Sequence, residues 1–437
     1  MIKILVIGSG AREHAIIKSL YKSSKKKTIY CLGTNNNPGI ADLCSELLVK
    51  NINDPEIVKS YAKDKKINFA IIGPENPLAN GIVDALLDIG IHSIGPKKEL
   101  AQIETSKSFT RNLLTTYKIP GTPKFKVFNT MNGVDDFLSV LGENYVIKYD
   151  GLAGGKGVKV AGDHLKSHKE AKQYCQELID KGGSFVIEKK LIGEEFSLMS
   201  FCDGNSLTHM PAVQDHKRAF EDDTGPNTGG MGTYSDSDHS LPFLDDNHIK
   251  AAKNINERTA KALKEKFGEG YKGVLYGGFI ATIDGVYLIE YNARFGDPEA
   301  MNVLSILETD FIDICQSIIE ENLHQIKIKF SNQATVCKYA VPEGYPDNPV
   351  KNKQLDISKV KNKDNLYYAS VELKNNTLFG LGSRSVAIIG KGDAIWEAEE
   401  IAENEISKVK GPVFHRKDIG TTKLLQKKIN NMASLKW

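Results

Sequence analysis

Two apolar runs joined by an Asp-Gly pair constrain this chain more than any other local pattern. Residues 275–283 are rich in apolar and aromatic side chains, Asp-Gly follows at 284–285, and 286–291 is a second such run. This arrangement predicts a β-hairpin, because the favoured tight turn needs positive φ at both central residues. Side chains alternate between the faces of a strand, so Glu290 and Asn292 share one face near the end of the second strand.

Glu290 and Asn292 together predict a magnesium site. A carboxylate and an amide carbonyl are both hard oxygen ligands, and Mg²⁺ held by one carboxylate usually keeps water and substrate phosphates as its other ligands. The pair therefore points to a nucleotide. A lone Glu-x-Asn would more simply be an exposed strand edge and a turn. Here a segment dense in charge, 294–299, follows at once, which is more typical of a functional loop.

Composition places the chain among ordinary globular proteins and excludes several functions. Its 437 residues suggest about three domains. The net charge of +2 gives no sign of nucleic-acid binding. No apolar run approaches a membrane span, and the N-terminal run at 4–7 is too short for a signal peptide. The six cysteines are scattered without a Cys-x-x-Cys pair, which fits a reducing cytoplasm and indicates neither a disulfide framework nor a zinc ribbon.

Residues 1–102 alternate apolar strands with amphipathic helices, which predicts a parallel α/β sheet. The first strand runs into a glycine turn that contains Gly8 and Gly10 and feeds a helix. Such a turn binds anions, because unpaired amides and the helix dipole both face the ligand. We expect strands at 2–7, 29–32, 69–72 and 92–94 and a helix at 13–21.

The glycine turn is not a dinucleotide fingerprint. Glu13 stands where the third glycine belongs, and the second strand ends without an acid for a ribose. We therefore expect a small phosphate-bearing molecule, although a turn needed only for tight packing is an alternative. Glu75 follows another strand, at the edge where open α/β sheets bind ligands, and is a candidate for sugar hydroxyls or an ordinary turn residue.

A glycine-rich loop follows the proline- and glycine-containing boundary at 119–123. Residues 124–191 have the pattern strand, helix, strand, glycine loop, strand, helix, strand. Lys148 ends a strand, and the loop around Lys156 is rich in glycine, so backbone amides could close on phosphate oxygens beside two cations. The loop lacks the Walker A order of Lys and Ser/Thr. A glycine hairpin without a ligand is the alternative.

The segment 196–234 is predicted to be a long loop that closes over a substrate, because it combines basic residues, polar donors and clustered glycines. A helix is expected at 246–267. Beyond 327, short strands and Asn-, Lys- and Asp-rich turns predict a small α+β domain that closes one wall of the site. Its expected elements are strands at 334–341, 367–373 and 386–390 and a helix near 393–409.

Taken together, these motifs resemble the ATP-grasp family and, within it, the phosphoribosylamine–glycine ligases of purine biosynthesis. The resemblance covers nearly the whole chain in the family's order. The loop at 223–232 and the Asn-x-Arg-Phe-Gly-Asp-Pro-Glu segment at 292–299 are specific in combination, whereas the glycine turn at 8–10 is not. The matching stretches are 8–14, 73–78, 147–158, 214–218, 223–232, 290–299 and 416–420.

The resemblance implies an α/β and α+β multidomain protein. Its parts would be an N-terminal Rossmann-like domain at 1–102, an ATP-grasp core at 103–123 and 192–326, an inserted lid at 124–191, and a small α+β domain at 327–437. The implied reaction joins glycine to 5-phosphoribosylamine and yields glycinamide ribonucleotide, ADP and phosphate through a glycyl phosphate. The implied partners are these small molecules and ATP with Mg²⁺ or Mn²⁺, in a monomeric cytoplasmic enzyme that binds neither nucleic acid nor membrane.

The resemblance also assigns roles to residues. Lys148 would act in catalysis, and Glu290 and Asn292 would hold the metal. We also expect Asp215 and Arg294 to act in catalysis as glycine contacts, because their charges complement its ammonium and carboxylate; an ion pair that braces the loop is the alternative. ATP would contact Lys107, Lys148, Gly154, Gly155, Lys156, Gly157, Glu188, Leu191 and Glu195. The other substrates would contact Gly8, Gly10, Arg12, Glu13, Glu75, Asp215, Lys217, Arg294 and Asp297.

Three alternatives belong to other reactions or classes. A carboxylase acting on biotin or an aminoimidazole ribonucleotide would share 148–292 but lack the 223–232 loop. An oxidoreductase would need the missing ribose acid, and a catalytically dead nucleotide sensor would have lost Lys148, Glu290 or Asn292. Many ATP-grasp proteins carry another metal-binding acid on the preceding strand. Residues 274–283 contain none, so the metal would have fewer protein ligands.

Overall fold

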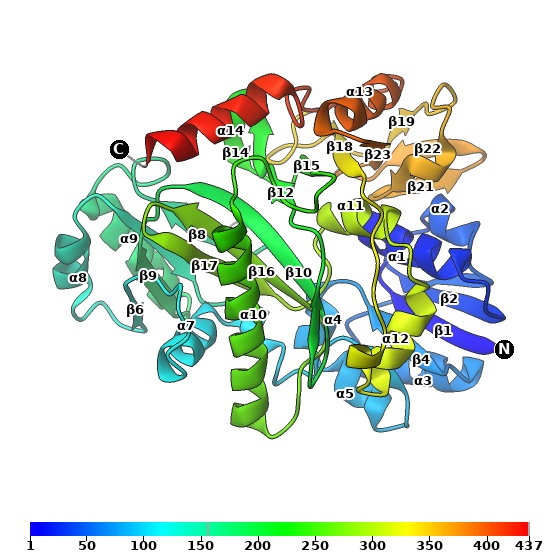
Figure 1. Cartoon of the computed structure of the whole chain (residues 1–437), viewed down its shortest axis with the longest axis horizontal. Coiled ribbons are helices and arrows are strands. Elements are labelled where there is room, and N and C mark those ends of the chain that lie inside the picture. Colours follow the sequence, from blue (N-terminus) through cyan, green and yellow to red (C-terminus); the bar gives the residue numbers. More distant parts are fainter. Residues whose placement is uncertain (155–156, 436–437) are drawn as a thin grey trace.

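A parallel sheet of five strands, in the order β3-β2-β1-β4-β5, forms the N-terminal part of the computed structural model, which describes residues 1–154 and 157–435 (Figure 1). The neighbours β1 and β4 end together, with Ile7 opposite Ile72. The turns after these strands therefore meet at the carboxyl edge of the sheet, where open α/β sheets bind ligands. The predicted strands and first helix are present, and β3 and α3 are additions. The elements are β1 (Ile2–Ile7), α1 (Ala11–Lys22), β2 (Lys27–Gly33), α2 (Pro38–Ala41), β3 (Glu46–Val49), α3 (Pro55–Lys65), β4 (Phe69–Ile72), α4 (Glu75–Ala79), α5 (Ile82–Leu87) and β5 (His92–Ile94).

The predicted hairpin is confirmed as the strands β16 (Lys272–Thr282) and β17 (Gly285–Asn292) of a sheet ordered β11-β10-β16-β17. Its register places Tyr276 opposite Asn292, with an irregularity at Gly278. Helix α10 (Asp246–Phe267) packs against this sheet, as predicted, and crosses in front of it in Figure 1. Within the described ranges, no helix is long and apolar enough to span a membrane. The other strands are β10 (Glu194–Asp203) and β11 (Leu207–His209), and the helices before the lid are α6 (Gln102–Thr105) and α7 (Lys107–Thr116).

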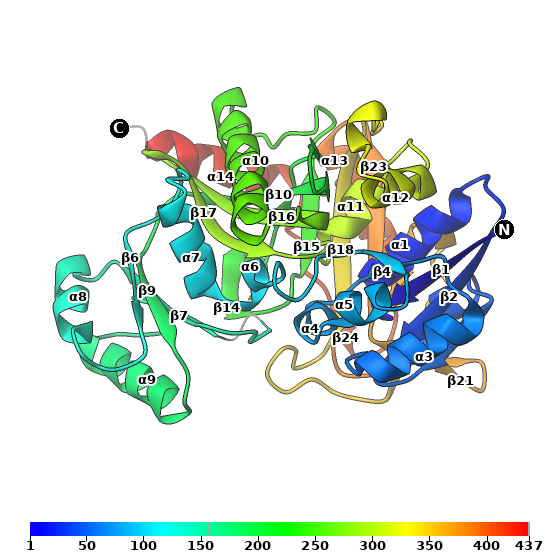
Figure 2. The same ribbon diagram turned by 90° about the horizontal axis from the view of Figure 1, so that it is seen from below.

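The segment between α7 and β10 forms a separate small unit with a sheet ordered β6-β9-β7-β8. Its strand–helix alternation agrees with the prediction for 124–191. The unit has a hydrophobic core of its own, built around side chains such as Phe128, Ile147 and Phe185. Figure 2 shows it standing apart from the N-terminal sheet. The elements are β6 (Phe125–Phe128), α8 (Val134–Leu141), β7 (Tyr145–Tyr149), β8 (Val158–Val160), α9 (His168–Asp180) and β9 (Phe185–Lys189).

The predicted long loop at 196–234 is wrong, because most of this segment forms strands. Strand β10 is buried from Phe196 to Asp203, since one face meets α10 and the other the interior. The later strands are short and polar, and β15 pairs with β18, about a hundred residues further along the chain. Such distant pairing leaves no local periodicity in the sequence. These elements are β12 (Gln214–Asp215), β13 (Arg218–Phe220), η1 (Glu221–Asp223), β14 (Thr224–Asn227) and β15 (Gly232–Ser235).

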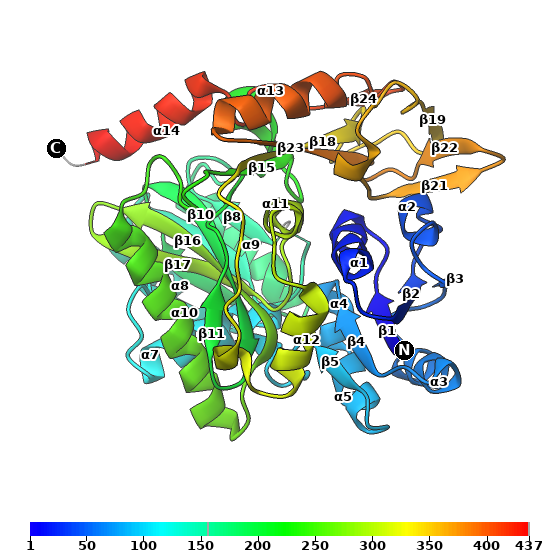
Figure 3. The ribbon, with the colours of Figure 1, turned by 45° about the vertical axis from the view of Figure 1, so that its right-hand side comes forward.

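The C-terminal part contains a sheet ordered β12-β15-β18-β23-β20, so two strands from the preceding region complete it. The predicted strand at 367–373 is two strands, β20 and β21, which belong to different sheets. Helix α14 has no counterpart among the expected elements, and it runs across the top of the molecule in Figure 3. The elements are β18 (Ala334–Pro342), β19 (Lys353–Leu355), β20 (Leu366–Tyr368), β21 (Val371–Lys374), β22 (Thr377–Gly380), β23 (Val386–Gly392), α13 (Ile395–Ile406), β24 (Val413–Phe414) and α14 (Thr422–Ser434).

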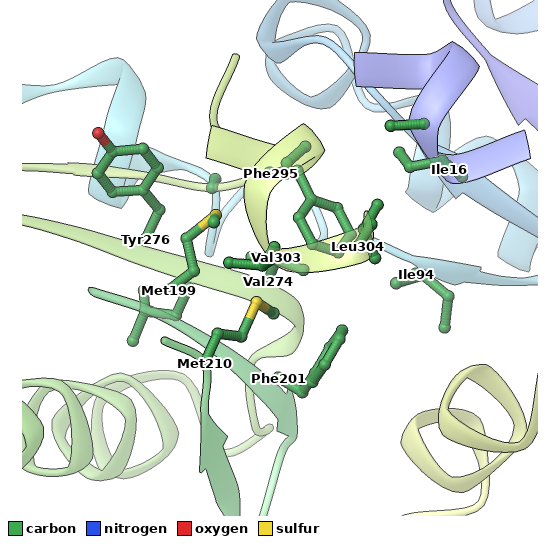
Figure 4. Packing of buried hydrophobic residues seen from close by; sticks show 14 of the residues in the cluster. Ile16, Ile94, Met199, Phe201, Met210, Val274, Tyr276, Phe295, Val303 and Leu304 are labelled. Carbon is green, nitrogen blue, oxygen red and sulfur yellow. The ribbon is translucent and has the colours of Figure 1, made fainter. Parts of the chain in front are cut away.

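One hydrophobic core joins the N-terminal sheet, the β10–β16–β17 sheet and the inner face of the C-terminal sheet. Figure 4 shows Phe295 and Leu304 packed between Ile16 and Ile94 on one side and Phe201 on the other. The rings of Phe201 and Phe295 meet edge to face, with centroids 6.0 Å apart. The segment that follows β17 is therefore wedged between two domains. Its helices are α11 (Glu299–Ser305) and α12 (Phe311–Ile319).

Candidate active site

One cleft gathers many of the residues predicted from the sequence. It lies between helix α4 of the N-terminal sheet, helices α6 and α7, the glycine-rich loop and the end of β17. Strand β9 forms the remaining side of the cleft. The predicted residues that line it are Glu75, Lys107, Gly154, Gly157, Glu188, Glu290, Asn292 and Arg294. Gly155 and Lys156, which we expect over the phosphates, lie outside the described residues.

A buried group of three charges forms the floor of this cleft. Glu188 Oε1 lies 2.6 Å from Arg111 Nε, and Glu188 Oε2 lies 2.8 Å from Lys148 Nζ. Both cations also donate to the carbonyl oxygen of Ile289 in β17, at 2.8 and 2.9 Å. Burial alone would raise the pKa of Glu188, but the charges of Arg111 and Lys148 outweigh it and lower that pKa to about 2. The group thus ties the small unit at 125–189 to the strand that carries Glu290.

The depressed pKa of Glu188 predicts a loss of stability in acid. A carboxyl whose pKa is lower in the folded than in the unfolded protein stabilises the fold above the unfolded value of about 4.3, and this contribution disappears as the pH falls through the folded value. We expect the free energy of unfolding to lose roughly 3 kcal/mol from this group between about pH 4.5 and pH 2. Urea unfolding at a series of pH values measures it.

Glu188→Gln is the matched variant for this prediction. It should be clearly less stable than the parent chain near neutrality, because Arg111 and Lys148 would lose their buried carboxylate. The difference between the two proteins should shrink as the pH falls toward 2. A difference that stays constant over this range would contradict the assignment.

The entry to the glycine loop is tied to the N-terminus of α7. The carboxylate of Asp150 accepts from Ser106 Oγ at 3.1 Å, from the Ser108 amide at 3.1 Å and from Ser184 Oγ at 3.3 Å. A carboxylate at a helix N-terminus is also stabilised by the helix dipole. Beside it, Lys107 Nζ donates to the carbonyl of Gly151 at 2.8 Å. Lys107 is thus held over the loop that is predicted to cover the phosphates.

Arg294 lies where the end of β17 meets the N-terminal domain. Its Nη2 is 3.0 Å from Glu104 Oε1 and donates to Asn292 Oδ1 at 3.0 Å, and its Nε is 3.6 Å from Glu75 Oε2. Burial lowers the pKa of the guanidinium, but the two glutamates outweigh it and raise the pKa, so the group stays charged. A fixed cation is therefore shared between both sides of the cleft.

Glu290 and Asn292 fit a divalent metal bound together with nucleotide oxygens. Burial raises the pKa of Glu290, but Lys217 and Lys148 outweigh it and lower the pKa, so the carboxylate is ionised. Lys217 Nζ lies 3.9 Å from Glu290 Oε1. Among residues 1–154 and 157–435 no group of three or more His, Cys, Asp or Glu could hold a metal by itself. One carboxylate and one amide oxygen suit Mg²⁺, which takes its remaining oxygens from phosphate and water.

The N-terminal glycine turn is folded around the side chain of Glu13. The Gly8 amide donates to Leu32 O at 2.8 Å, and the Gly10 amide donates to Glu13 Oε2 at 2.6 Å. A Cβ on Gly73 would lie 2.1 Å from Glu13 Oε1, so Gly73 leaves room for the carboxylate. The side chain of Glu13 therefore occupies the space that would be empty if the third glycine of a dinucleotide fingerprint stood at position 13. The amides left for an anion are those of the first turn of α1, which have no acceptor within the helix.

The remaining predicted residues lie outside the lining of the cleft. Arg12 Nη1 donates to Phe295 O at 3.3 Å, which connects the glycine turn to the segment after β17. Asp215 Oδ1 is buried and finds no hydrogen-bond partner in the described part of the chain. Asp297 pairs with Arg384, at 3.0 Å. Leu191 follows β9, and Glu195 lies 3.8 Å from Lys217.

The sequence analysis missed several site residues. Arg111 lies in α7 and Asp150 at the entry to the glycine loop, and their partners lie far along the chain. Glu299 is buried beside Tyr276, whose hydroxyl donates to it, and its charge acts on both Asp215 and Arg294. The only sign of Glu299 in the sequence is its position in the charge-dense segment 294–299.

Comparison with known proteins gives consistent matches along the chain. Three family profiles match in order: "Phosphoribosylglycinamide synthetase, N domain" at 2–104, its "ATP-grasp (A) domain" at 105–300 and its "C domain" at 335–422. Phosphoribosylamine–glycine ligase of Methanosarcina barkeri is 49% identical over 434 residues, 99% of this chain and 100% of that protein. The ligase of Methanocaldococcus jannaschii is 48% identical over 444 residues, with 99% and 100% covered.

Solved structures agree with these matches. Phosphoribosylamine–glycine ligase of Thermotoga maritima is similar with a TM-score of 0.80 and 27% identity, over 96% of this chain and 100% of that one. An N5-carboxyaminoimidazole ribonucleotide synthetase in complex with ADP is similar with a TM-score of 0.66 and 14% identity, over 92% and 96%. The second likeness is one of fold alone.

Proposed function

Because the chain belongs to the phosphoribosylglycinamide synthetase family, the phosphoribosylamine–glycine ligases, we propose that its reaction passes through a glycyl phosphate formed in the cleft at the end of β17. The protein is an ADP-forming ligase of purine biosynthesis that joins glycine to 5-phosphoribosylamine. It uses ATP with a divalent metal ion. Membership of this family places the fold among the ATP-grasp enzymes and excludes the oxidoreductase alternative.

The proposed route has two displacements. A carboxylate oxygen of glycine attacks the γ-phosphorus of ATP, and ADP leaves. The amine of phosphoribosylamine then attacks the carbonyl carbon, and phosphate leaves with one of the glycine oxygens. Neither step needs a nucleophile from the protein. The protein contributes positioning and neutralisation of charge, which are the main sources of rate in phosphoryl transfer.

We assign the ATP phosphates to Lys107, Lys148 and the glycine loop at 154–157. Lys107, Gly154 and Gly157 line one cleft, and Lys148 lies beside it, with its Nζ 2.8 Å from the cleft residue Glu188. Backbone groups of Glu188 and Leu191 would meet the adenine, and Glu195 the ribose. Glu290 and Asn292 would hold Mg²⁺ or Mn²⁺, which supplies positive charge to the phosphates when bound. The carboxylate of Glu188 is itself occupied by Arg111 and Lys148, which leaves only its backbone for a nucleotide.

The placement of Arg294 carries the proposal. One buried guanidinium contacts Asn292, on the side of the metal and ATP, and Glu75, on the side of the N-terminal sheet. A carboxylate bound there would lie between the γ-phosphate and the incoming amine. The charge of Glu299 acts on both Asp215 and Arg294, so the two groups lie near one carboxylate, which supports their assignment as contacts for the two charged ends of glycine. The remaining substrate contacts, with glycine or 5-phosphoribosylamine, are assigned to Gly8, Gly10, Arg12, Glu13, Glu75, Lys217 and Asp297.

Domain boundaries and state of assembly complete the proposal. We place the boundaries at 1–102, 103–123 with 192–326, 124–191 and 327–437. Residues 124–191 have a hydrophobic core of their own, separate from the main core, which supports the lid boundary. We propose a monomer as the active form. Six free cysteines support a reducing, cytoplasmic location.

An assay of products tests the proposed function. With ATP, a divalent metal, glycine and phosphoribosylamine, we expect ADP and glycinamide ribonucleotide to appear in a one-to-one ratio. Omission of either co-substrate should stop glycinamide ribonucleotide formation. Release of AMP and pyrophosphate, or ADP formation without incorporation of glycine, would contradict the proposal.

Hydrogen exchange tests the phosphate role of the glycine loop. Amides at 151–154 and 157–158 should exchange more slowly when ATP and Mg²⁺ are added, because the loop amides would then donate to phosphate oxygens. The amides of α10, on the far side of the sheet, serve as the internal control and should not change. Equal exchange with and without nucleotide at 151–158 would favour a glycine hairpin that binds nothing.

A further inference from the structure

Arg384 is an arginine of the C-terminal domain whose side chain is largely buried, and the sequence motifs did not include it. It lies in the connection between β22 and β23, and its side chain is 15% exposed. The backbone on either side is fixed, because the Ser385 amide donates to Ala340 O at 2.9 Å and the Ser370 amide donates to Arg384 O at 2.9 Å. The guanidinium therefore leaves a rigid segment and points toward the active-site loops.

The guanidinium of Arg384 joins two segments of the site to the C-terminal sheet. Its Nη1 donates to the carbonyl oxygens of Gly229 at 2.6 Å, Gly230 at 3.2 Å and Asp297 at 2.9 Å. Its Nη2 lies 3.0 Å from Asp297 Oδ2. The group also lies 4.6 Å from the ring centroid of Tyr339, whose hydroxyl donates to Asp297 Oδ1 at 2.7 Å. One side chain thus fixes both the 229–230 turn and the segment after β17.

The turn that Arg384 holds packs directly against Asp215. Gly230 has φ +108°, and a Cβ built on it would lie 2.8 Å from Asp215 Oδ1 and 2.7 Å from Pro298. Pro298 follows Asp297 in sequence, so the two segments fixed by Arg384 meet at the Asp215 carboxylate. Within the described ranges, Asp215 Oδ1 is buried without a hydrogen-bond partner. The orientation of this oxygen therefore depends on the walls around it.

Arg384 also contributes to the charge balance around Asp215. The groups that face this carboxylate are Glu299 from α11, Tyr276 from β16, Cys337 from β18, Lys217 and Arg384. Burial and the charge of Glu299 raise the pKa of Asp215 well above its ordinary value. The charges of Lys217 and Arg384 lower this pKa but do not outweigh them. Loss of Arg384 would leave Lys217 as the nearby cation among these groups.

We propose that Arg384 is a positioning residue for glycine: by fixing the 229–230 turn and the Asp297 segment, it holds the Asp215 carboxylate toward the ammonium group of the substrate. The inference rests on the proposed function, in which Asp215 contacts glycine. It adds the C-terminal domain to the elements that determine affinity for glycine. It also explains why Arg384 makes four polar contacts although it touches no part of the nucleotide cleft.

Steady-state kinetics of Arg384→Gln test the proposal. We expect the KM for glycine to rise roughly 10-fold or more, the effect of one lost charge-assisted hydrogen bond, while the KM for ATP changes less than about 2-fold. KM does not depend on the fraction of enzyme that folds, so partial misfolding would not imitate this result. Arg384→Lys keeps the charge but not the planar fork, and its KM for glycine should fall between those of the parent and Arg384→Gln.

Arg416→Gln is the matched control. Arg416 is also a buried arginine of the C-terminal domain and fixes the other end of the same region, through Asp223 at 2.8 Å and the carbonyl of Arg218 at 3.2 Å. It should lower stability without a selective rise in the KM for glycine. An equal, selective rise in both variants would show a general effect of loosening this region and would overturn the proposal.

Asp215→Asn separates the two levels of inference. If it raises the KM for glycine and Arg384→Gln does not, the positioning role of Arg384 is wrong and the glycine contact stands. If Asp215→Asn leaves the KM for glycine unchanged, the assignment of Asp215 itself fails, and the role proposed for Arg384 fails with it. A selective rise in both variants is the result that we expect.

Discussion

Replacement of Glu290 by glutamine should lower kcat on the order of 10²-fold or more, by analogy with loss of one preorganised charge contact. Glu290 is the one carboxylate of the proposed metal site, and it is ionised under the influence of Lys217 and Lys148. Glutamine keeps the size and one oxygen of the side chain but removes the charge that attracts a cation. The fold should be preserved, because the change removes no core volume. Rates of ADP formation and thermal unfolding measure the two effects.

The metal dependence of the variants makes this prediction specific. Glu290→Gln should need a higher concentration of Mg²⁺ for half-maximal rate, and Asn292→Ala should show a milder shift, because it removes a neutral ligand. Glu321→Gln is a control at a surface pair with Lys272, 2.8 Å apart and outside the cleft, and should behave as the parent does. Normal turnover of Glu290→Gln at limiting Mg²⁺ would rule out the metal assignment.

Replacement of Arg294 by methionine should affect both stability and activity strongly. The guanidinium is the buried partner of Glu104 at 3.0 Å and lies 3.6 Å from Glu75. Removal of one partner from a buried ion pair typically costs about 3–5 kcal/mol, because the remaining charge is left uncompensated. Turnover should fall on the order of 10²-fold or more, because a fixed cation at the reacting centre is lost. Urea unfolding and kcat for ADP formation measure these effects.

A second substitution separates the structural loss from the catalytic one. Burial already raises the pKa of Glu104 despite the opposing charge of Arg294. Addition of Glu104→Gln to Arg294→Met should therefore recover part of the stability, because a buried charge without a partner becomes a neutral amide. Turnover should stay low in the double variant. Recovery of both would mean that Arg294 only braces the fold.

The parts of the fold that the sequence predicted well are those stabilised by local interactions. The β16–β17 hairpin has an Asp-Gly turn, β1 is a continuous apolar run, and α10 has an Asp245 N-cap and a Gly268 C-cap with φ +75°. Each signal lies within a few residues of the element that it specifies. The strand and helix order of 124–191 was predicted for the same reason, since that segment also folds around its own core.

The segments that sequence analysis described incorrectly depend on distant partners. Strand β15 is a short run that pairs with β18, and α14 is held by contacts such as Lys428 with Asp223 and Glu194, at 2.8 and 3.1 Å. Helix α14 could not be predicted because most of its surface is polar. Nothing within either segment indicates the surface against which it packs.

The residues of the candidate site also divide into those with a local signal in the sequence and those without one. Glu290, Asn292 and Lys148 could be predicted because each ends or follows an apolar strand with an unexpected polar group. Arg111 and Arg384 could not, because an arginine in a helix or a connection has no distinctive pattern until its partners are known. Both make their main contacts with residues about 70 or more positions away in the chain.

Isotope transfer from glycine tests most directly whether this cleft phosphorylates the carboxylate of glycine. Glycine labelled with ¹⁸O in both carboxylate oxygens should be converted in the presence of ATP, a divalent metal and phosphoribosylamine. The glycyl phosphate route predicts that each inorganic phosphate carries one labelled oxygen and that glycinamide ribonucleotide retains the other. Mass spectrometry of the two products gives both values. Unlabelled phosphate, formed together with glycinamide ribonucleotide, would contradict the account.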